Sequence, residues 1–263
     1  MTKTILVLAA NPKDTPTLRL NQEVREIDDV LRRAQKRDEF VLEQKLAARP
    51  QDVRRAMLDC KPNIVHFCGH GAGAEGIAFE DEMGQIQLVN ADVLSGFFEL
   101  FSNNLECVVL NACFSEAQAE AIARHIPCVI GMKGTVGDNA AIAFAIAFYD
   151  ALGAGESVEF AYKLARNATQ WTRTPSGMMP VLKTFGLSVL KALNQPKNVR
   201  RTARGIRDDT GLDITTVKEQ LEILEINGCV SRIERSNGER WTITARGKKL
   251  VEDTSRESSD LSQ

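Results

Sequence analysis

The stretch IVHFCGHG, residues 64–71, decides the fold of this chain and most of its chemistry. It begins as a short apolar run of the kind that forms a buried strand, and His70 stands where that strand should give way to a loop. A second stretch, CVVLNACFS at residues 107–115, has the same form and places Cys113 just after its apolar run. Open parallel sheets carry their chemistry at the ends of their strands, so His70 and Cys113 are the candidates for a base and a nucleophile.

Length, charge and cysteine content set the broad class of the protein. A chain of 263 residues favours one large domain and a small one. Its formal net charge of −2 gives no general reason to expect nucleic acid or an anionic membrane as a partner. The first apolar run, residues 5–8, is too short for a signal sequence, and six cysteines without a Cys-x-x-Cys pair are typical of reduced thiols. We therefore expect a soluble, cytoplasmic protein with no membrane span.

Outward from the two stretches, short apolar strands alternate with helices up to about residue 186. Strands are expected at residues 5–10, 40–44, 64–68, 107–112, 127–132 and 179–185. Helices are expected at residues 18–36, 49–58, 93–101, 116–125, 140–152 and 157–168, and a hairpin at residues 76–88 with its turn at Met83-Gly84. This alternation predicts an α/β fold with a mostly parallel sheet that helices cover on both faces.

The pattern changes after residue 186. Helices are expected at residues 187–193, where Pro196 follows as a stop, at a segment marked by Val199, Ala203 and Ile206, and at residues 213–226. Residues 229–234 and 240–245 flank Ser236-Asn237-Gly238 as a second hairpin. Three helices and a hairpin indicate a small winged helix-turn-helix domain. We therefore expect domains at residues 1–186 and 187–251, followed by a polar, disordered tail at residues 252–263.

Several motifs of residues 1–186 resemble the CHAT family of caspase-like cysteine peptidases. They are residues 5–12 followed by Leu18-Arg19-Leu20 and Glu23, Val65-His66-Phe67 with His70-Gly71, Leu110-Asn111-Ala112-Cys113, and Val129-Ile130-Gly131-Met132 leading to Asp138. The resemblance implies a three-layer, caspase-like fold and a cysteine endopeptidase with a His–Cys dyad. It also implies a family that often supplies the effector of bacterial defence or cell-death systems.

The chemistry of such a dyad assigns a role to each candidate residue. A free thiol has a pKa of about 8.5 and is mostly protonated at neutral pH, so the Cys113 thiol needs a base. His70 would take the thiol proton and later give it to the leaving amine. Cys113 also precedes a predicted helix, whose N-terminal dipole favours a thiolate. The oxyanion needs backbone N–H donors that no side chain blocks, and the N–H groups of Gly71 and Cys113 are the candidates.

The other histidines and strand cysteines have structural interpretations. His66 lies inside a strand and is expected to be a hydrogen-bonded core residue, and Cys68 is expected to be packed. His125 ends a predicted helix and is interpreted as structural. A metal site formed by His66, Cys68 and His70 with Cys60 is the minor alternative, because their spacing matches no zinc pattern. No cofactor is expected.

Three residues are candidates for substrate binding. Asn111 stands two residues before Cys113, where metacaspase-like relatives carry an acidic residue for a basic P1 side chain, and a neutral amide weakens the expectation of Arg/Lys specificity. Asp138 could serve the same pocket, although we favour it as the N-cap of the helix that follows. Lys133 would instead favour an acidic P1 residue, unless it is simply solvated.

The expected winged helix leaves two kinds of partner open. Its third helix is acidic and would repel phosphate, whereas its second helix is basic. The residues concerned are Asp213, Glu219, Glu222 and Glu225 with Lys218 in the third helix, and Arg200, Arg201, Arg204 and Arg207 in the second. We therefore favour a regulatory or sensor protein, or an identical subunit, over DNA.

Two functions follow from the sequence. The first is a regulated cysteine endopeptidase that cleaves a protein partner and is recruited or activated through the winged helix. The second is a non-enzymatic DNA-binding regulator or adaptor that uses an inactive caspase-like scaffold. An intact dyad supports the first function, and the acidic third helix counts against the second.

Overall fold

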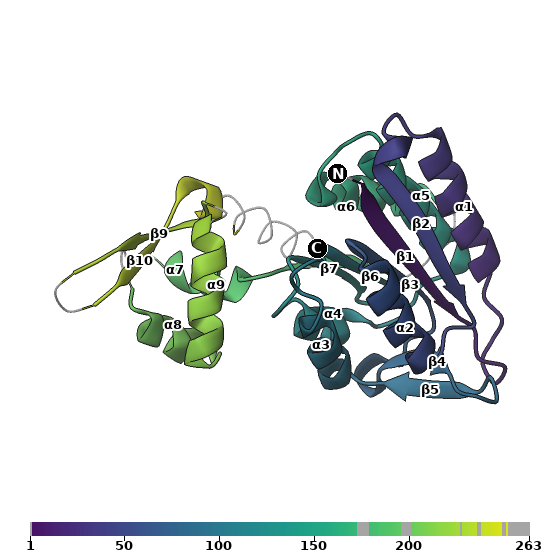
Figure 1. Ribbon diagram of the computed structural model, residues 1–263, viewed down its shortest axis with the longest axis horizontal. Helices are drawn as coiled ribbons and strands as arrows, with labels where there is room; N and C mark the ends of the chain where they lie inside the picture. The colour runs from purple at the N-terminus through teal and green to yellow at the C-terminus, as the bar shows by residue number, and fades with distance from the viewer. Residues whose placement is uncertain are drawn as a thin grey trace. The chain divides into compact units, whose positions relative to one another are not determined.

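The chain divides into two compact units, Met1–Thr184 and Phe185–Gln263. The computed structural model describes residues 2–172, 179–195, 201–226, 228–235, 238–248 and 251 (Figure 1). Pro196, Val199, Ser236-Asn237 and the tail at residues 252–263 lie outside the described residues. Within the described parts, the helices are too short or too polar for any of them to cross a membrane. The expected boundary at residue 186 lies two residues after the division that the structure shows.

A six-stranded sheet with the order β2-β1-β3-β6-β7-β8 forms the centre of the first unit. The strands are β1 (Lys3–Ala10), β2 (Phe40–Leu46), β3 (Ile64–Gly69), β6 (Cys107–Asn111), β7 (Cys128–Met132) and β8 (Pro180–Thr184). Neighbouring strands are parallel from β2 to β7, and β8 runs antiparallel to β7. The mostly parallel sheet expected from the sequence is confirmed. Because Cys68 is paired with Asn111, β3 and β6 end side by side.

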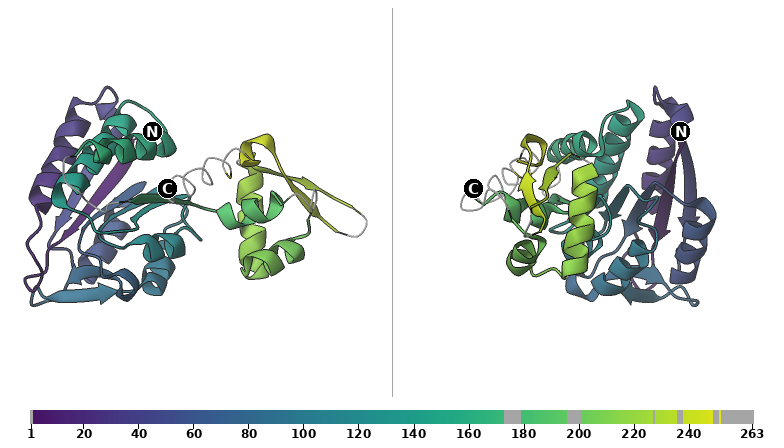
Figure 2. Two further views of the ribbon diagram at one scale, coloured as in Figure 1. Left: turned by 180° about the vertical axis from the view of Figure 1, so that it is seen from behind. Right: turned by 60° about the vertical axis from the view of Figure 1, so that its left-hand side comes forward.

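Helices cover both faces of this sheet and complete three layers (Figure 1, Figure 2). One face is covered by α1 (Leu20–Arg33), α5 (Asp138–Gly153) and α6 (Val158–Gln170), and the other by α2 (Pro50–Cys60), α3 (Ala91–Glu99) and α4 (Glu116–Ile122). Alternate residues of β1 enter the two cores, Val7 on the first face and Leu8 on the second. Both sides of the strand are therefore buried, which explains its continuous apolar run.

Two helix ends differ from the expectation. The N-cap expected at Asp138 is wrong, because Gly137 is the N-cap with an extended backbone (φ −85°, ψ 145°) and Asp138 is the first residue of α5. The Asp138 carboxylate instead lies 3.3 Å from Nε of Arg19. On the other face, α4 ends at Ile122, so His125 lies beyond the helix, with its Nδ1 3.6 Å from a carboxylate oxygen of Glu99.

A two-stranded hairpin, β4 (Ile77–Glu80) and β5 (Ile86–Val89), follows β3. Its turn is closed by Asp81, whose Oδ1 accepts hydrogen bonds of 2.8 Å from the N–H groups of Met83 and Gln85. Gly84 takes a left-handed φ of 74° in this turn, which glycine adopts without strain. The hairpin expected at residues 76–88 is confirmed. Short 3₁₀ turns lie at Arg37–Glu39 (η1) and Gly73–Glu75 (η2).

The second unit has its own apolar core. Its described elements are α7 (Leu187–Leu193), α8 (Ala203–Thr210), α9 (Ile214–Ile226) and the antiparallel strands β9 (Val230–Ile233) and β10 (Arg240–Ile243). Leu190, Ile206, Leu221 and Trp241 are buried together between them. The order of the elements follows the sequence pattern, and the assignment as a winged helix stays a prediction.

Candidate active site

The loops after β3 and β6 meet backbone to backbone at Gly71 and Cys113. A Cβ atom on Gly71 would lie 2.1 Å from the carbonyl oxygen of Cys113, a separation that real side chains do not show. Residue 71 must therefore be glycine for the two loops to approach this closely. The contact places the residue that follows His70 directly against Cys113.

The His70 ring is held by a backbone carbonyl. Its Nε2 lies 2.8 Å from the oxygen of Pro16, in the loop between β1 and α1. A carbonyl can only accept, so Nε2 carries a hydrogen in this contact, and Nδ1 of the neutral ring keeps its lone pair. A free lone pair is what a general base requires. The sequence did not identify Pro16 as the partner of His70, because every residue has a backbone carbonyl and its side chain does not show which carbonyl will accept a hydrogen bond.

Cys113 differs from the other five cysteines in its surroundings. It is partly exposed, as Cys60 and Cys128 are, but the N–H of Val136 donates to its sulfur at 3.2 Å. An N–H donor in this position can bond to a thiolate when one forms. Burial raises the pKa of each of the remaining thiols, which are Cys60, Cys68, Cys107, Cys128 (to about 12) and Cys229. Those five thiols therefore stay protonated at neutral pH.

The two expected oxyanion donors belong to the two loops that meet at Gly71 and Cys113. The bridge between Gly71 and Ile77 is formed by the N–H groups of Ala72 and Ala78, so this pairing leaves the Gly71 N–H unused. On the other side, Phe114 donates its N–H to the carbonyl of Gly134 at 3.1 Å and takes a left-handed φ of 52°. This conformation is strained for a bulky side chain and fixes the chain direction after Cys113. The role of the Gly71 and Cys113 N–H groups as oxyanion donors stays a prediction.

Two buried side chains hold the loop after Cys113. The Ser115 hydroxyl donates to the carbonyl of Leu110 at 3.0 Å and accepts from the N–H of Met132 at 2.9 Å, which joins β6 to β7. The Gln118 amide donates to the carbonyl of Gly73 at 2.6 Å. This second bond connects α4 to the loop that follows His70.

A buried polar cluster joins β3 and β6 to α1 and α5. Oε1 of Glu23 accepts from His66 Nε2 at 2.9 Å and from the Asn111 amide at 2.7 Å. The other ring nitrogen of His66 lies 3.1 Å from the Tyr149 hydroxyl. Burial keeps that phenol neutral, since it raises the pKa of Tyr149 well above its usual value. His66 is thus confirmed as a hydrogen-bonded core residue, and neither of its ring nitrogens is free for a metal.

The three candidates for substrate binding lie in different environments. Asn111 is 3% exposed and directs its amide at Glu23 and the carbonyl of Ala141. Lys133 is exposed and begins the loop whose later residues contact Phe114 and Cys113. Asp138 follows this loop as the first residue of α5 and is already paired with Arg19. The substrate-binding roles of all three residues stay predictions.

Comparison with known proteins identifies the family. The family model described as the CHAT domain matches residues 3–178. This chain belongs to the CHAT family. The resemblance drawn from the His-Gly and Ala-Cys motifs is therefore confirmed, and all the matched residues lie in the first unit.

Curated relatives of the CHAT domain are named as proteases. The chain is 26% identical over 182 residues to a Roc-COR-CHAT protease of an unknown prokaryotic organism, and 25% identical over 173 residues to a probable protease of Gillisia limnaea. These alignments cover 66% and 64% of this chain but only 17% and 31% of the two relatives. Among solved structures, the Drosophila initiator caspase Dronc matches 70% of this chain and 80% of its own at 9% identity, with a TM-score of 0.48.

Proposed function

We propose that this chain is a cysteine endopeptidase with Cys113 as its nucleophile and His70 as its general base. The observation that carries the proposal is the backbone contact between Gly71 and Cys113, which sets the His70 loop against a partly exposed cysteine. The hydrogen bond to Pro16 supports the same role, because it leaves Nδ1 of His70 free to accept a proton. The protease names of the relatives agree with this chemistry.

The reaction proceeds in two halves. Nδ1 of His70 takes the proton of the Cys113 thiol, and the thiolate attacks the carbonyl carbon of the scissile bond. The N–H groups of Gly71 and Cys113 bind the oxyanion. The C–N bond then breaks, and the leaving amine takes the proton from His70, which leaves a thioester on Cys113. Water attacks the thioester while His70 accepts its proton, and the carboxylic acid product departs as the thiol reforms.

The charges beside the loop from β7 to α5 favour an acidic over a basic P1 residue. Asp138 is neutralised by Arg19, so it offers little to a cationic side chain. Lys133 is exposed and forms no ion pair with a described residue. A carboxylate of the substrate would gain a charge-assisted hydrogen bond there. Asn111 is the last residue of β6, and it would act by holding the end of this strand to Glu23 through its amide.

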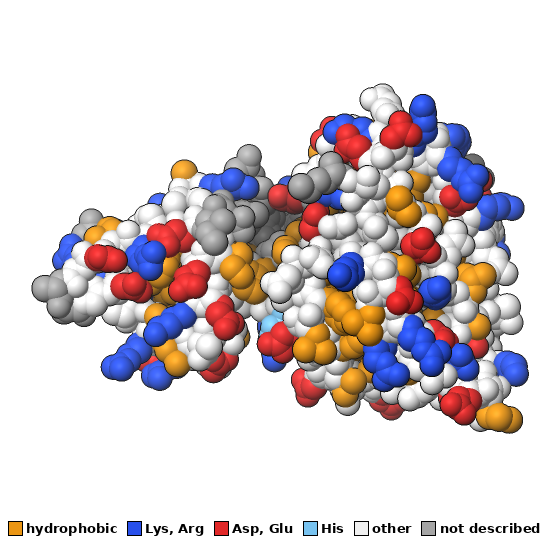
Figure 3. All heavy atoms as spheres, viewed as in Figure 1, with side chains coloured by type: hydrophobic (Ala, Val, Ile, Leu, Met, Phe, Trp, Pro, Cys, Tyr) orange, Lys and Arg blue, Asp and Glu red, His pale blue; other side chains and the backbone are white. Residues whose placement is uncertain are grey.

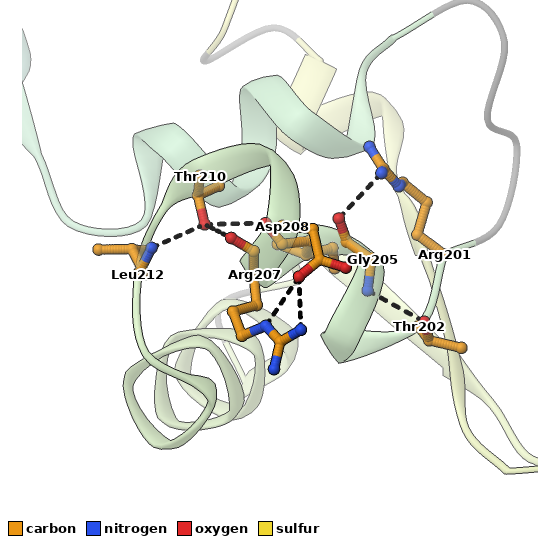
Figure 4. A network of polar contacts seen from close by, with 8 residues as sticks. Arg201, Thr202, Gly205, Arg207, Asp208, Thr210 and Leu212 are labelled. Atoms are coloured by element: carbon orange, nitrogen blue, oxygen red, sulfur yellow. Dashed lines mark hydrogen bonds and ion pairs between the residues drawn. The ribbon is translucent and has the colours of Figure 1, made fainter.

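The second unit is proposed to bind a protein, either a regulatory or sensor protein or an identical subunit. Several of its arginines are paired within the unit. Arg201 pairs with Asp209. It also donates to the carbonyl of Gly205 at 2.9 Å, and Arg207 donates to Asp208 at 2.8 Å (Figure 4). Arg232 lies 3.2 Å from Glu239. Paired cations release few counterions, which disfavours DNA as the partner.

The visible surface of the second unit is mixed in charge. Asp and Glu side chains lie among the Lys and Arg side chains on the face shown, and several Lys and Arg side chains gather at its lower edge (Figure 3). Recruitment by a protein suits an effector of bacterial defence or cell death, whose cleavage must wait for a signal. The winged-helix unit would supply that control.

Cleavage of a partner protein tests the function. Purified protein is incubated with the products of neighbouring genes, and the fragments are located by mass spectrometry. We expect a defined cut that disappears in Cys113→Ala and in His70→Ala and persists in His125→Ala, whose side chain pairs with Glu99. Persistence of the cut in the first two variants would refute the dyad. Salt-sensitive, sequence-selective DNA binding together with a Cys113 that resists alkylation would support the non-enzymatic regulator instead.

A further inference from the structure

The β4–β5 hairpin contacts the backbone of the proposed base. The N–H of Ala78 in β4 donates to the carbonyl of His70 at 3.0 Å, and the N–H of Ala72 donates to the carbonyl of Gly76 at 2.9 Å. The residues on both sides of Gly71 are therefore bonded to the first strand of the hairpin or to the residue just before it. This fixes the His70 backbone but leaves the direction of its ring undetermined.

The ring direction is set by the loop between β1 and α1. Pro16 in this loop accepts from Nε2 of His70 at 2.8 Å. Pro16 is exposed and lies outside any helix or strand, so something else must fix the position of its carbonyl.

This loop is fastened to the second half of the hairpin. Oδ1 of Asp14 accepts from the N–H of Ile86 in β5 at 2.9 Å. The N–H of Lys13 donates to the carbonyl of Gly84 at 2.9 Å, and its Nζ donates to the carbonyl of Met83 at 3.1 Å. Of the two residues that make these contacts, Asp14 is nearer in sequence to Pro16. Its contact is also the one made with β5, whereas Lys13 contacts the hairpin turn.

We propose that Asp14 is a positioning residue for the general base and that the β4–β5 hairpin is the frame through which it acts. The contacts form a closed ring: His70 to Pro16 through the imidazole, Asp14 to β5 through the carboxylate, and β4 back to the His70 carbonyl. Loss of the Asp14 contact removes the fastening nearest to Pro16, leaves only the contacts of Lys13 with the hairpin turn, and allows the Pro16 carbonyl to move away. The imidazole then loses the acceptor that holds its hydrogen on Nε2. This inference rests on the proposed function.

A purely structural role for Asp14 predicts a different result. Its carboxylate and its partner N–H are exposed, so the contact adds little to the core. A structural residue would change the stability of the protein without changing how the reactivity of Cys113 depends on pH. A positioning residue changes the pH dependence while the protein remains folded.

The experiment measures alkylation of Cys113 by iodoacetamide, followed by peptide mapping, in the full chain and its variants from about pH 5 to about pH 9. Asp14→Ala is expected to slow the reaction near neutral pH by about threefold to tenfold, the effect of one lost hydrogen bond, and to move the rise in rate to higher pH. Asp14→Asn keeps an oxygen acceptor for the Ile86 N–H and is expected to retain the wild-type profile.

A second variant reaches the same loop from the hairpin. A Cβ on Gly84 would lie 3.0 Å from the Lys13 side chain, at a φ of 74° that alanine adopts only with strain. Gly84→Ala is therefore expected to slow alkylation of Cys113 as well. A wild-type profile in Asp14→Ala would overturn the inference, as would equal slowing by Asp14→Ala and Asp14→Asn.

His70→Ala separates failure of this inference from failure of the proposed function. Slow alkylation in His70→Ala with a wild-type profile in Asp14→Ala would retain the dyad and reject the role of Asp14. An unchanged rate in His70→Ala would reject the dyad itself, and the positioning role with it.

Discussion

Replacing Gly71 with alanine tests the backbone contact on which the site depends. The new Cβ would lie 2.1 Å from the Cys113 carbonyl oxygen and 3.1 Å from its carbonyl carbon, whereas real Cβ atoms stay at least 3.0 Å from such atoms. Both atoms belong to backbone, so no flexible side chain can move aside, and the two loops must separate by about 1 Å. A displacement of about 1 Å in a catalytic group lowers the rate by about 10²-fold, and overpacking costs about 1–3 kcal/mol of stability.

The assay for Gly71→Ala follows acylation of Cys113 by a p-nitrophenyl ester, with Cys113→Ala as the blank, and unfolding in urea. We expect acylation to be slower by about 10²-fold in a protein that still folds. Gly96→Ala is the matched control, because nothing lies within 4 Å of its added Cβ in α3. It should acylate at the wild-type rate and gain about 0.5–1 kcal/mol of stability. Wild-type acylation and stability in Gly71→Ala would refute the close approach of the two loops.

Three further predictions concern stability. Glu23→Ala removes the buried acceptor of His66 and Asn111 and should lower the free energy of unfolding in urea by about 3–5 kcal/mol; a loss below about 1 kcal/mol would show that the cluster is dispensable. Phe114→Gly relieves a left-handed φ of 52° and should raise the same free energy by about 1 kcal/mol, and an unchanged urea midpoint would argue against strain at this residue. Burial raises the pKa of Cys128 from about 9 in the unfolded chain to about 12 in the folded protein. The protonated thiol therefore contributes its full stabilisation below about pH 9, and this contribution is lost as the pH rises toward 12. The free energy of unfolding of the wild type should therefore fall relative to that of Cys128→Ala above about pH 9, and parallel pH profiles would contradict the shift.

The elements that carry the site could be predicted from the sequence. Both stretches form strands that are buried on their two faces, and each strand ends within one residue of its expected end. Full burial leaves a continuous apolar run, and that signal does not depend on knowledge of the neighbouring strands. The two apolar runs therefore predict where β3 and β6 end, and with them the positions of His70 and Cys113.

The supporting contacts could be predicted only in part. Glu23 lies on the apolar face of α1 between Leu20 and Ile27, and a carboxylate on such a face signals a buried partner, although not which one. Pro16 acts through its carbonyl, which every residue has. The cap at Asp138 was mispredicted because Gly137 already supplies the extended backbone that an N-cap needs. Contacts made by backbone groups thus could not be predicted from the sequence, because they depend on where the folded chain places each carbonyl and N–H.

The most direct test of the dyad is the rate at which iodoacetamide alkylates Cys113 near pH 7 in the wild type and in His70→Ala. A thiol with an ordinary pKa of about 8.5 is only about 3% ionised at that pH, so removal of a functioning base should slow the reaction by about tenfold or more. His125→Ala should react at the wild-type rate, because His125 pairs with Glu99. Equal rates in the wild type and His70→Ala would contradict the assignment of His70 as the base for Cys113.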